Sequence, residues 1–365
     1  MFKLASEVIQ GVVSSLAKGA RKAKLGEKFI FIKTKDDKVS FYFNGDDMSV
    51  ERKISADIQG ELDVATSIKE LDQKVSALPK EEEITVEKEG NLLKLKWGKG
   101  SKISVEILPE TAPLIEIPQM SQQVKWAAGT LHGIARMMTP FAALPDSPVG
   151  RARPSVCGPN FQKDGDTGEV FIRATDSYRA VTVLGSKIDW FEGNQLSMES
   201  KTMLSLADVL SEQAELTVGL NESGTLVIFR AGLTTAIARV LEGSYPNIDK
   251  YADDAKSKWH FDRLELIELC RRIKRLSPTK PIIQFRIQSG KVKAIVPNSL
   301  EQQLAVAVEG EASDFGANAE YLEMTASLYR SDEIVLLADG ANQPITIRQE
   351  ENDNVKALVL PVRID

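Results

Sequence analysis

The chain has 365 residues, 42% hydrophobic and 27% charged, which is enough apolar material for two to three packed domains and excludes general disorder. Its 46 basic and 52 acidic residues give a formal charge of −6. This excludes a uniformly basic surface that binds nucleic acid, but it allows a local basic face. The two cysteines, Cys157 and Cys270, lie too far apart in sequence for a disulfide scaffold or a zinc cluster. With no long apolar run and no signal peptide, the sequence predicts a cytoplasmic protein.

Catalytic residue patterns are scarce. Only His132 and His260 are present, and neither lies in an HExxH motif or beside a nucleophile. The segment DGDTGE at 164–169 begins like a calcium loop but lacks the later ligands, so a hairpin turn is expected. We therefore predict no enzyme activity, no metal and no cofactor.

The first third of the chain predicts a helix, a hairpin, a second helix and three strands. The helices are expected at 6–16 and 68–78, and the hairpin at 39–54, where β-branched and aromatic residues surround the turn NGDD. Three strands with two turns follow from Ile84. Together these elements indicate an α+β unit with antiparallel strands.

The same order of elements returns twice. In the middle third the helices are expected at 124–138 and 202–210, the hairpin at 170–184 and the three strands from Leu216. In the last third the helices are expected at 262–276 and 319–329, the hairpin at 292–308 and the three strands from Ile334. The hairpin turns at Asp46, Asp176 and Asn298 precede the three-strand groups by 38, 40 and 36 residues. Such near-equal spacing indicates three repeats of about 122 residues, an ordinary domain size.

Connectors rich in Pro, Asp and Asn separate the repeats at 109–119 and 245–257. We therefore predict three α+β domains at 1–117, 118–250 and 251–365.

Three short motifs add a family resemblance to this repeat. They are ATDSYRA at 174–180, VLEGSYPNI at 240–248 and VLPVRI at 359–364, with GKGSKISVEILPETAP at 98–113 in support. In order and position they resemble the bacterial DNA polymerase III β sliding clamp over essentially the whole chain. Ser177 and Tyr178 stand where this family commonly has Gly and His, Ala180 replaces the usual Leu, and Asp365 extends the terminus, as in a divergent or phage- or plasmid-borne clamp.

The resemblance implies three clamp-type domains with helices inside and antiparallel sheets outside, paired head to tail as a homodimeric ring around double-stranded DNA. Such a ring binds DNA without reading its sequence, because phosphate contacts carry no sequence information. The resemblance implies that nine basic residues face DNA: Arg21, Lys22, Lys24, Lys69, Arg151, Arg153, Lys201, Arg271 and Arg272. A solvated helix face is the alternative for each cluster.

The resemblance also implies a groove between the second and third domains that binds short peptides of the polymerase and the clamp loader. Its expected walls are Val156, Thr175, Tyr178, Arg179, Pro246, Lys250, Tyr251, Leu358, Leu360, Pro361, Val362, Arg363 and Ile364. Apolar side chains would take hydrophobic anchors, and Arg179 and Arg363 would donate to peptide carbonyls or carboxylates. Alternatively, residues 358–364 are only an edge strand, where Pro361 is tolerated.

For the dimer interface the resemblance implies Ile103 and Val105 on one side, and Leu276 and Glu301 on the other. Alternatively, Ile103 and Val105 face the core of their own domain, since the alternation in KISVEI shows one buried face but not what covers it. The sequence thus predicts a DNA sliding clamp and processivity factor that tethers the replicative polymerase. The alternative is a three-domain peptide-binding scaffold that does not encircle DNA.

Overall fold

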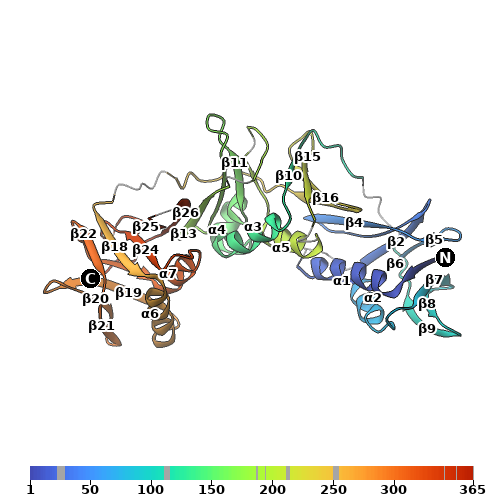
Figure 1. Cartoon of the computed structure of the whole chain (residues 1–365), viewed down its shortest axis with the longest axis horizontal. Helices are drawn as coiled ribbons and strands as arrows, with labels where there is room; N and C mark the ends of the chain where they lie inside the picture. Colours follow the sequence, from blue (N-terminus) through green and yellow to red (C-terminus); the bar gives the residue numbers. More distant parts are fainter. Residues whose placement is uncertain are drawn as a thin grey trace. The chain divides into compact units, whose positions relative to one another are not determined.

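The computed structural model describes residues 1–22, 29–110, 116–185, 188–193, 195–210, 214–249, 255–340, 342–350 and 352–364. Contacts divide the chain into two compact units (Figure 1). Unit 1 consists of residues 1–136 and 198–241, and unit 2 of residues 137–197 and 242–365.

Unit 1 holds two antiparallel sheets. The first has the order β5 (Asp57–Ile58), β1 (Phe2–Ala5), β7 (Glu83–Glu89), β8 (Leu92–Trp97) and β9 (Ser101–Glu106). The second has the order β10 (Gln122–Trp126), β15 (Leu216–Leu220), β16 (Leu226–Ala231), β17 (Thr234–Arg239), β4 (Met48–Ser55), β3 (Lys38–Asn44), β2 (Phe29–Lys35) and β6 (Asp63–Ser67).

Three helices of unit 1 pack side by side, with α1 (Ser6–Lys22) in contact with both α2 (Ile68–Val75) and α5 (Ser200–Val209). A side chain at Gly19 would meet Cγ2 of Val209 at 2.2 Å, and the Ser205 hydroxyl donates to the Gly19 carbonyl at 3.0 Å. Glycine is therefore required where α1 and α5 approach each other.

Unit 2 also holds two antiparallel sheets. The larger has the order β14 (Leu196–Ser197), β11 (Asn160–Lys163), β12 (Val170–Thr175), β13 (Arg179–Leu184), β26 (Asn352–Val359), β25 (Ile345–Gln349), β24 (Glu333–Leu337), β18 (Ser257–Asp262) and β22 (Ala307–Gly310). The smaller has the order β21 (Leu300–Leu304), β20 (Lys291–Val296), β19 (Ile282–Gln288) and β23 (Phe315–Asn318).

Helices α6 (Arg263–Leu276) and α7 (Ala319–Ala326) lie side by side in unit 2, while α4 (Pro148–Ala152) and the 3-10 turns η1 (Thr139–Phe141) and η2 (Pro154–Val156) precede β11. The core includes an edge-to-face contact of Trp259 with Phe315, whose ring centroids lie 5.0 Å apart. Such aromatic pairs bury large areas in a specific geometry.

The two larger sheets join strands from neighbouring repeats. In unit 1, β4 of the first repeat pairs with β17 of the second, Thr234 lying opposite Arg52. In unit 2, β13 of the second repeat pairs with β26 of the third, Arg179 lying opposite Val359. Each junction therefore joins the second strand of a hairpin to the last strand of a three-strand group. The division by contacts cuts through the middle repeat, and the three-domain boundaries stay a prediction.

The predicted elements are found in their expected order, with one error. The helix predicted over 124–138 begins only at Thr130 as α3 (Thr130–Met138), in which the chain passes from unit 1 to unit 2, because residues 122–126 form β10. Trp126 is buried there against Phe229, and Gly129 takes a φ of 79° between strand and helix. Burial in a sheet outweighs the helical spacing of this short segment.

Both cysteines are buried free thiols. The turn at 164–169 is the predicted hairpin turn, in which one carboxylate oxygen of Asp164 accepts from the backbone N–H groups of Asp166 and Thr167. Among the described residues no helix is both long and apolar enough to cross a membrane.

Candidate peptide-binding pocket and basic surface

The turn between β12 and β13 forms one wall of a pocket in unit 2. The Asp176 carboxylate accepts from the N–H groups of Tyr178 at 2.9 Å and Arg179 at 3.0 Å, and Thr175 Oγ1 donates to the Arg179 carbonyl at 2.7 Å. Ser177 takes a φ of 74°, in the left-handed region that glycine enters without steric cost. The serine that replaces the usual glycine is thus tolerated in a turn held by hydrogen bonds.

The Arg179 guanidinium is held by protein groups. It donates to Asp176 through Nε at 3.1 Å and to the Met324 sulfur through Nη1 at 2.9 Å, and it lies 4.5 Å from the ring centroid of Tyr321. Met324 and Tyr321 both belong to α7. The side chain therefore fixes the β12–β13 turn against α7, and its donation to a bound peptide stays a prediction.

The second wall is the segment 244–249, which includes the end of the motif VLEGSYPNI. The Ser155 hydroxyl donates to the Ser244 carbonyl at 3.0 Å, which holds its start. At its end Asp249 accepts from Arg173 Nε at 2.7 Å and from the Thr182 hydroxyl at 3.0 Å. Between these two anchors, Pro246 and Ile248 are carried over the sheet of β12 and β13.

The floor and the third wall come from the end of the chain. Leu358, Ala180 and Ile248 form a small buried apolar cluster. Beyond it the Leu360 N–H donates to the Tyr178 carbonyl at 2.8 Å, while the side chains of Leu360 and Tyr178 are 41% and 54% exposed. Large apolar side chains that remain exposed beside a concave site indicate a surface for another molecule.

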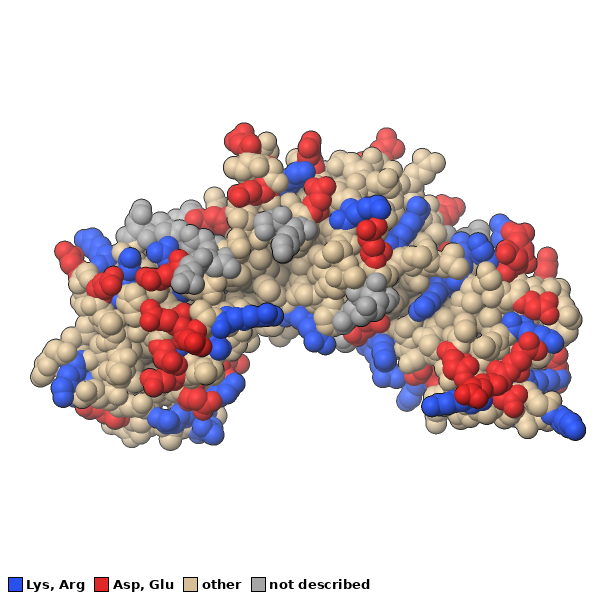
Figure 2. Space-filling model, viewed as in Figure 1, with Lys and Arg blue, Asp and Glu red and all other residues tan. Residues whose placement is uncertain are grey.

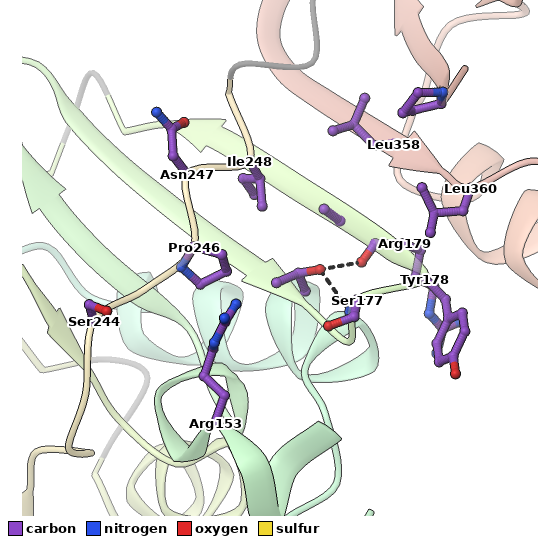
Figure 3. A pocket seen from close by; sticks show the side chains of 13 residues that line it. Arg153, Ser177, Tyr178, Arg179, Ser244, Pro246, Asn247, Ile248, Leu358 and Leu360 are labelled. Atoms are coloured by element: carbon purple, nitrogen blue, oxygen red, sulfur yellow. Dashed lines mark hydrogen bonds between the residues drawn. The ribbon is translucent and has the colours of Figure 1, made fainter. Parts of the chain in front are cut away.

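These walls enclose a pocket of about 430 Å³. Figure 3 shows Arg153 and Pro246 at one end and Tyr178 and Leu360 at the other. The residues lining the pocket are Arg153, Thr175, Ser177, Tyr178, Arg179, Ala180, Ser244, Pro246, Asn247, Ile248, Pro344, Leu358 and Leu360. The volume and the mixture of apolar and polar groups suit a short peptide or a small molecule.

The pocket brings together Thr175, Tyr178, Arg179, Pro246, Leu358 and Leu360 of the predicted set. Val156 does not line it, because it is fully buried with Ala143 and Tyr245. Pro361, Val362, Arg363 and Ile364 do not line it either, since the chain turns there toward β23. Lys250 and Tyr251 lie outside the described residues.

Arg153 was predicted to face DNA, but the structure places it at this pocket. Sequence reasoning also missed Ser177, Ala180, Ser244, Asn247, Ile248 and Pro344. Ile248 ends the motif VLEGSYPNI and could have been found there, whereas Pro344 has no local signal because a loop between β24 and β25 brings it to the pocket.

The other predicted DNA-facing residues lie mostly on helices. In unit 1 Arg21, Lys69 and Lys201 are exposed on α1, α2 and α5, and Arg21 donates to Asp72 at 3.0 Å. The side chain of Lys22 and all of Lys24 lie outside the described residues. Three exposed basic groups thus stand on the three packed helices of unit 1.

In unit 2, Arg151 is exposed at α4, and Figure 2 shows a short row of Lys and Arg side chains over the region labelled α4 in Figure 1. Arg271 is exposed on α6 but pairs with Glu268 at 2.8 Å and Glu323 at 2.9 Å. Arg272 donates to Gln302 at 2.6 Å. The field of Arg271 is therefore partly neutralised by its own neighbours, unlike a purely basic face.

The four residues predicted for the dimer interface lie at or near two sheet edges. In β9, Val105 is fully buried in its own unit, whereas Ile103 is only half-buried. Leu276 is 47% exposed at the end of α6, and Glu301 lies on β21, paired with Lys293 of the same chain at 2.5 Å. The alternative reading, that this face of β9 packs on its own core, holds for Val105.

The described residues contain no group of three or more His, Cys, Asp or Glu side chains placed to hold a metal ion.

Solved structures match the chain over its whole length. The DNA polymerase III β subunit of Thermotoga maritima matches with a TM-score of 0.86 at 17% identity, and a sliding clamp of Bartonella birtlesii bound to griselimycin with a TM-score of 0.87 at 19% identity. A sliding clamp of Pseudomonas aeruginosa bound to griselimycin matches with a TM-score of 0.85 at 19% identity. Each match covers 100% of this chain and 99% of the other.

In sequence, the chain is 24% identical over 228 residues to the β sliding clamp of Bacillus subtilis, and 23% identical over 267 residues to that of Staphylococcus epidermidis. In sequence and in fold the chain is similar to the bacterial β sliding clamps. The matched part spans 59% of this chain and 59% of the B. subtilis clamp, and 70% and 68% for S. epidermidis. No protein-family model matches the chain.

The predicted clamp fold is thus confirmed, and the low identity to known clamps fits the predicted divergence. The low identity agrees with the replaced residues of the β12–β13 turn, where Ser177 and Tyr178 depart from the clamp pattern.

Proposed function

We propose that this chain is a DNA sliding clamp and processivity factor. Two copies close into a ring around duplex DNA, and the pocket of unit 2 holds peptides of the replicative polymerase and of the clamp loader. The observation that carries the proposal is the whole-length match in fold to bacterial β subunits and clamps. In this proposal the chain performs no catalytic step, uses no cofactor and acts in the cytoplasm.

The pairing rule of the repeats supports ring closure. Within the chain the hairpin strands β4 and β13 pair with the last strands of the next three-strand groups, β17 and β26. Two strands in the equivalent positions have no such partner within the described residues. They are β21, the second hairpin strand of the third repeat, which ends the four-stranded sheet, and β9, the last strand of the first three-strand group, which ends the five-stranded sheet. Pairing β21 of one copy with β9 of the other completes the series head to tail and removes both edges.

This arrangement accounts for the predicted interface residues. Ile103 on β9 and Leu276 beside the β19–β21 sheet carry apolar surface that a partner would bury, while ion pairs of exposed Glu301 contribute only about 0–1 kcal/mol. We keep the three repeats as domains 1–117, 118–250 and 251–365, because the pairing rule applies to repeats and not to the two contact units.

The basic groups of α1, α2 and α5 support sliding on DNA. Arg21, Lys69 and Lys201 are exposed, and cations on flexible side chains bind phosphate without reading sequence. Retention then comes from the closed ring, so a protein of formal charge −6 can remain on DNA without a strongly basic outer surface.

Two measurements test the ring. The mass in solution should be twice 40.2 kDa at micromolar concentration, and a stable monomer would favour the scaffold that does not encircle DNA. After loading by a clamp-loader fraction, the protein should stay on nicked circular DNA in high salt and leave when the circle is cut. Retention that is equal on circular and linear DNA contradicts encirclement.

The pocket is tested separately. Deleting residues 360–365 should abolish polymerase stimulation and leave the dimer intact, because Leu360 lines the pocket and both edge strands are retained. A short peptide from the polymerase tail should compete with the polymerase for the wild-type protein. We propose griselimycin as a second probe, since clamps of P. aeruginosa and B. birtlesii bind it.

A further inference from the structure

The last residues of the chain bridge the two sheets of unit 2. The Leu360 N–H donates to Tyr178 at the pocket, and two residues later the Val362 N–H donates to the Gly316 carbonyl on β23, both at 2.8 Å. Between them stands Pro361, whose ring limits the backbone. The segment that carries Leu360 is therefore anchored on both sides.

Gly316 leaves no space for a side chain at the second anchor. A Cβ atom there would lie 2.5 Å from Cγ2 of Ile364 and 2.6 Å from the Val362 carbonyl oxygen. Ordinary contacts of this kind need more than 3 Å, so residues 362–364 would have to move away from β23. Glycine is needed here for close approach of two backbones.

The element that contains Gly316 also supports the opposite wall of the pocket. β23 continues into α7, whose Tyr321 and Met324 hold the Arg179 guanidinium and thereby the β12–β13 turn. The turn and the tail are thus both fixed on the same β23–α7 element.

We propose that Gly316 is a positioning residue for the pocket: by docking residues 362–364 on β23 it fixes Leu360 beside Tyr178. Gly316 does not itself line the pocket. The placing of Leu360 follows from these contacts, and only the identity of the bound peptide rests on the proposed function.

The test compares Gly316→Ala with Gly165→Ala in the full-length protein. The control adds the same methyl group in unit 2, where no atom lies within 4 Å and φ is not in the left-handed region. In Gly316→Ala, hydrogen exchange of the Leu360 and Val362 amides should be about fivefold faster, the factor expected for one lost hydrogen bond. Affinity for griselimycin should fall by a similar factor of about five. In Gly165→Ala neither quantity should change.

A thermodynamic cycle separates this role from general destabilisation. Truncation after Pro361 removes the docked residues but keeps Leu360, and should itself lower griselimycin affinity. Adding Gly316→Ala to the truncated protein should then have no further effect, because the partner of Gly316 is gone. An equal loss in both backgrounds, or wild-type exchange in a folded Gly316→Ala protein, overturns the proposal. If Gly316→Ala does not fold, the truncated protein decides. Griselimycin affinity and Leu360 amide exchange equal to those of the wild-type protein then overturn the proposal.

The two proposals fail in different ways. If griselimycin and polymerase peptides do not bind the wild-type protein, the pocket function is contradicted, but the exchange measurement still decides whether Gly316 positions Leu360.

Discussion

Replacing Asp249 with alanine should loosen the wall of the pocket that carries Pro246 and Ile248. Asp249 accepts from Arg173 and Thr182, and these bonds hold the end of the segment on the sheet of β12 and β13. The Arg173 side chain is only 9% exposed, whereas that of Asp249 is 41% exposed. The substitution therefore leaves a buried guanidinium without its carboxylate.

The expected magnitude lies between two limits. Breaking a fully buried ion pair costs about 3–5 kcal/mol, and losing an exposed pair costs about 0–1 kcal/mol. Because Asp249 is partly screened by water, we expect Asp249→Ala to lower the free energy of unfolding by about 2 kcal/mol. Asp249→Asn keeps an acceptor for Arg173 and should lose about half as much, about 1 kcal/mol.

Urea titration followed by circular dichroism measures the effect, provided that the slope with urea stays constant. The matched control is Glu215→Ala, whose partner Lys125 is 72% exposed, so its loss should be about 0.5 kcal/mol or less. A change for Asp249→Ala as small as that of the control refutes the reasoning. Asp249→Ala should also weaken griselimycin binding, since Ile248 belongs to the pocket floor.

Three further predictions concern the interface, DNA and pH. Leu276→Asp should halve the mass in solution and Leu264→Asp, on the same helix and 56% exposed, should not; equal masses contradict the interface. Lys69→Ala with Lys201→Ala should reduce the slope of log affinity for DNA against log salt by about two, and an unchanged slope removes these lysines from the DNA contact. Burial alone would raise the pKa of Glu323, but hydrogen bonds from Arg271 and Lys274 outweigh it and hold the pKa below 4.5. Its ion pairs therefore stabilise α6 and α7 above pH 4.5, and this contribution is lost as the pH falls through the lower folded pKa, so the urea midpoint of Glu323→Gln should depend less on acid pH.

The repeated helices and strands could be predicted from the sequence because each is marked by residues within its own segment. Alternating apolar residues and turn residues mark the hairpin β12–β13 and the group β24–β26, and the structure has both. The pairing of β4 with β17 could not be predicted in this way, because it depends on which edges meet after the repeats have formed.

The pocket was predicted in part for the same reason. Thr175 and Leu360 lie in motifs with fixed spacing, so their positions could be transferred. Arg153 follows a basic pattern that suits DNA or a pocket equally well, and only the fold of η2 and the 244–249 segment brings it to the pocket. Val156 lies in the right segment, but its side chain points into the core, which sequence position alone does not reveal.

The joining of β4 to β17 also has a consequence for synthesis of the chain. β4 ends at Ser55 and β17 begins only at Thr234, so the larger sheet of unit 1 cannot close until most of the chain has left the ribosome. At about 5–20 residues per second this leaves β4 with a single neighbouring strand for about 10–40 s. Until then its open edge is a target for chaperones and for pairing with other nascent chains.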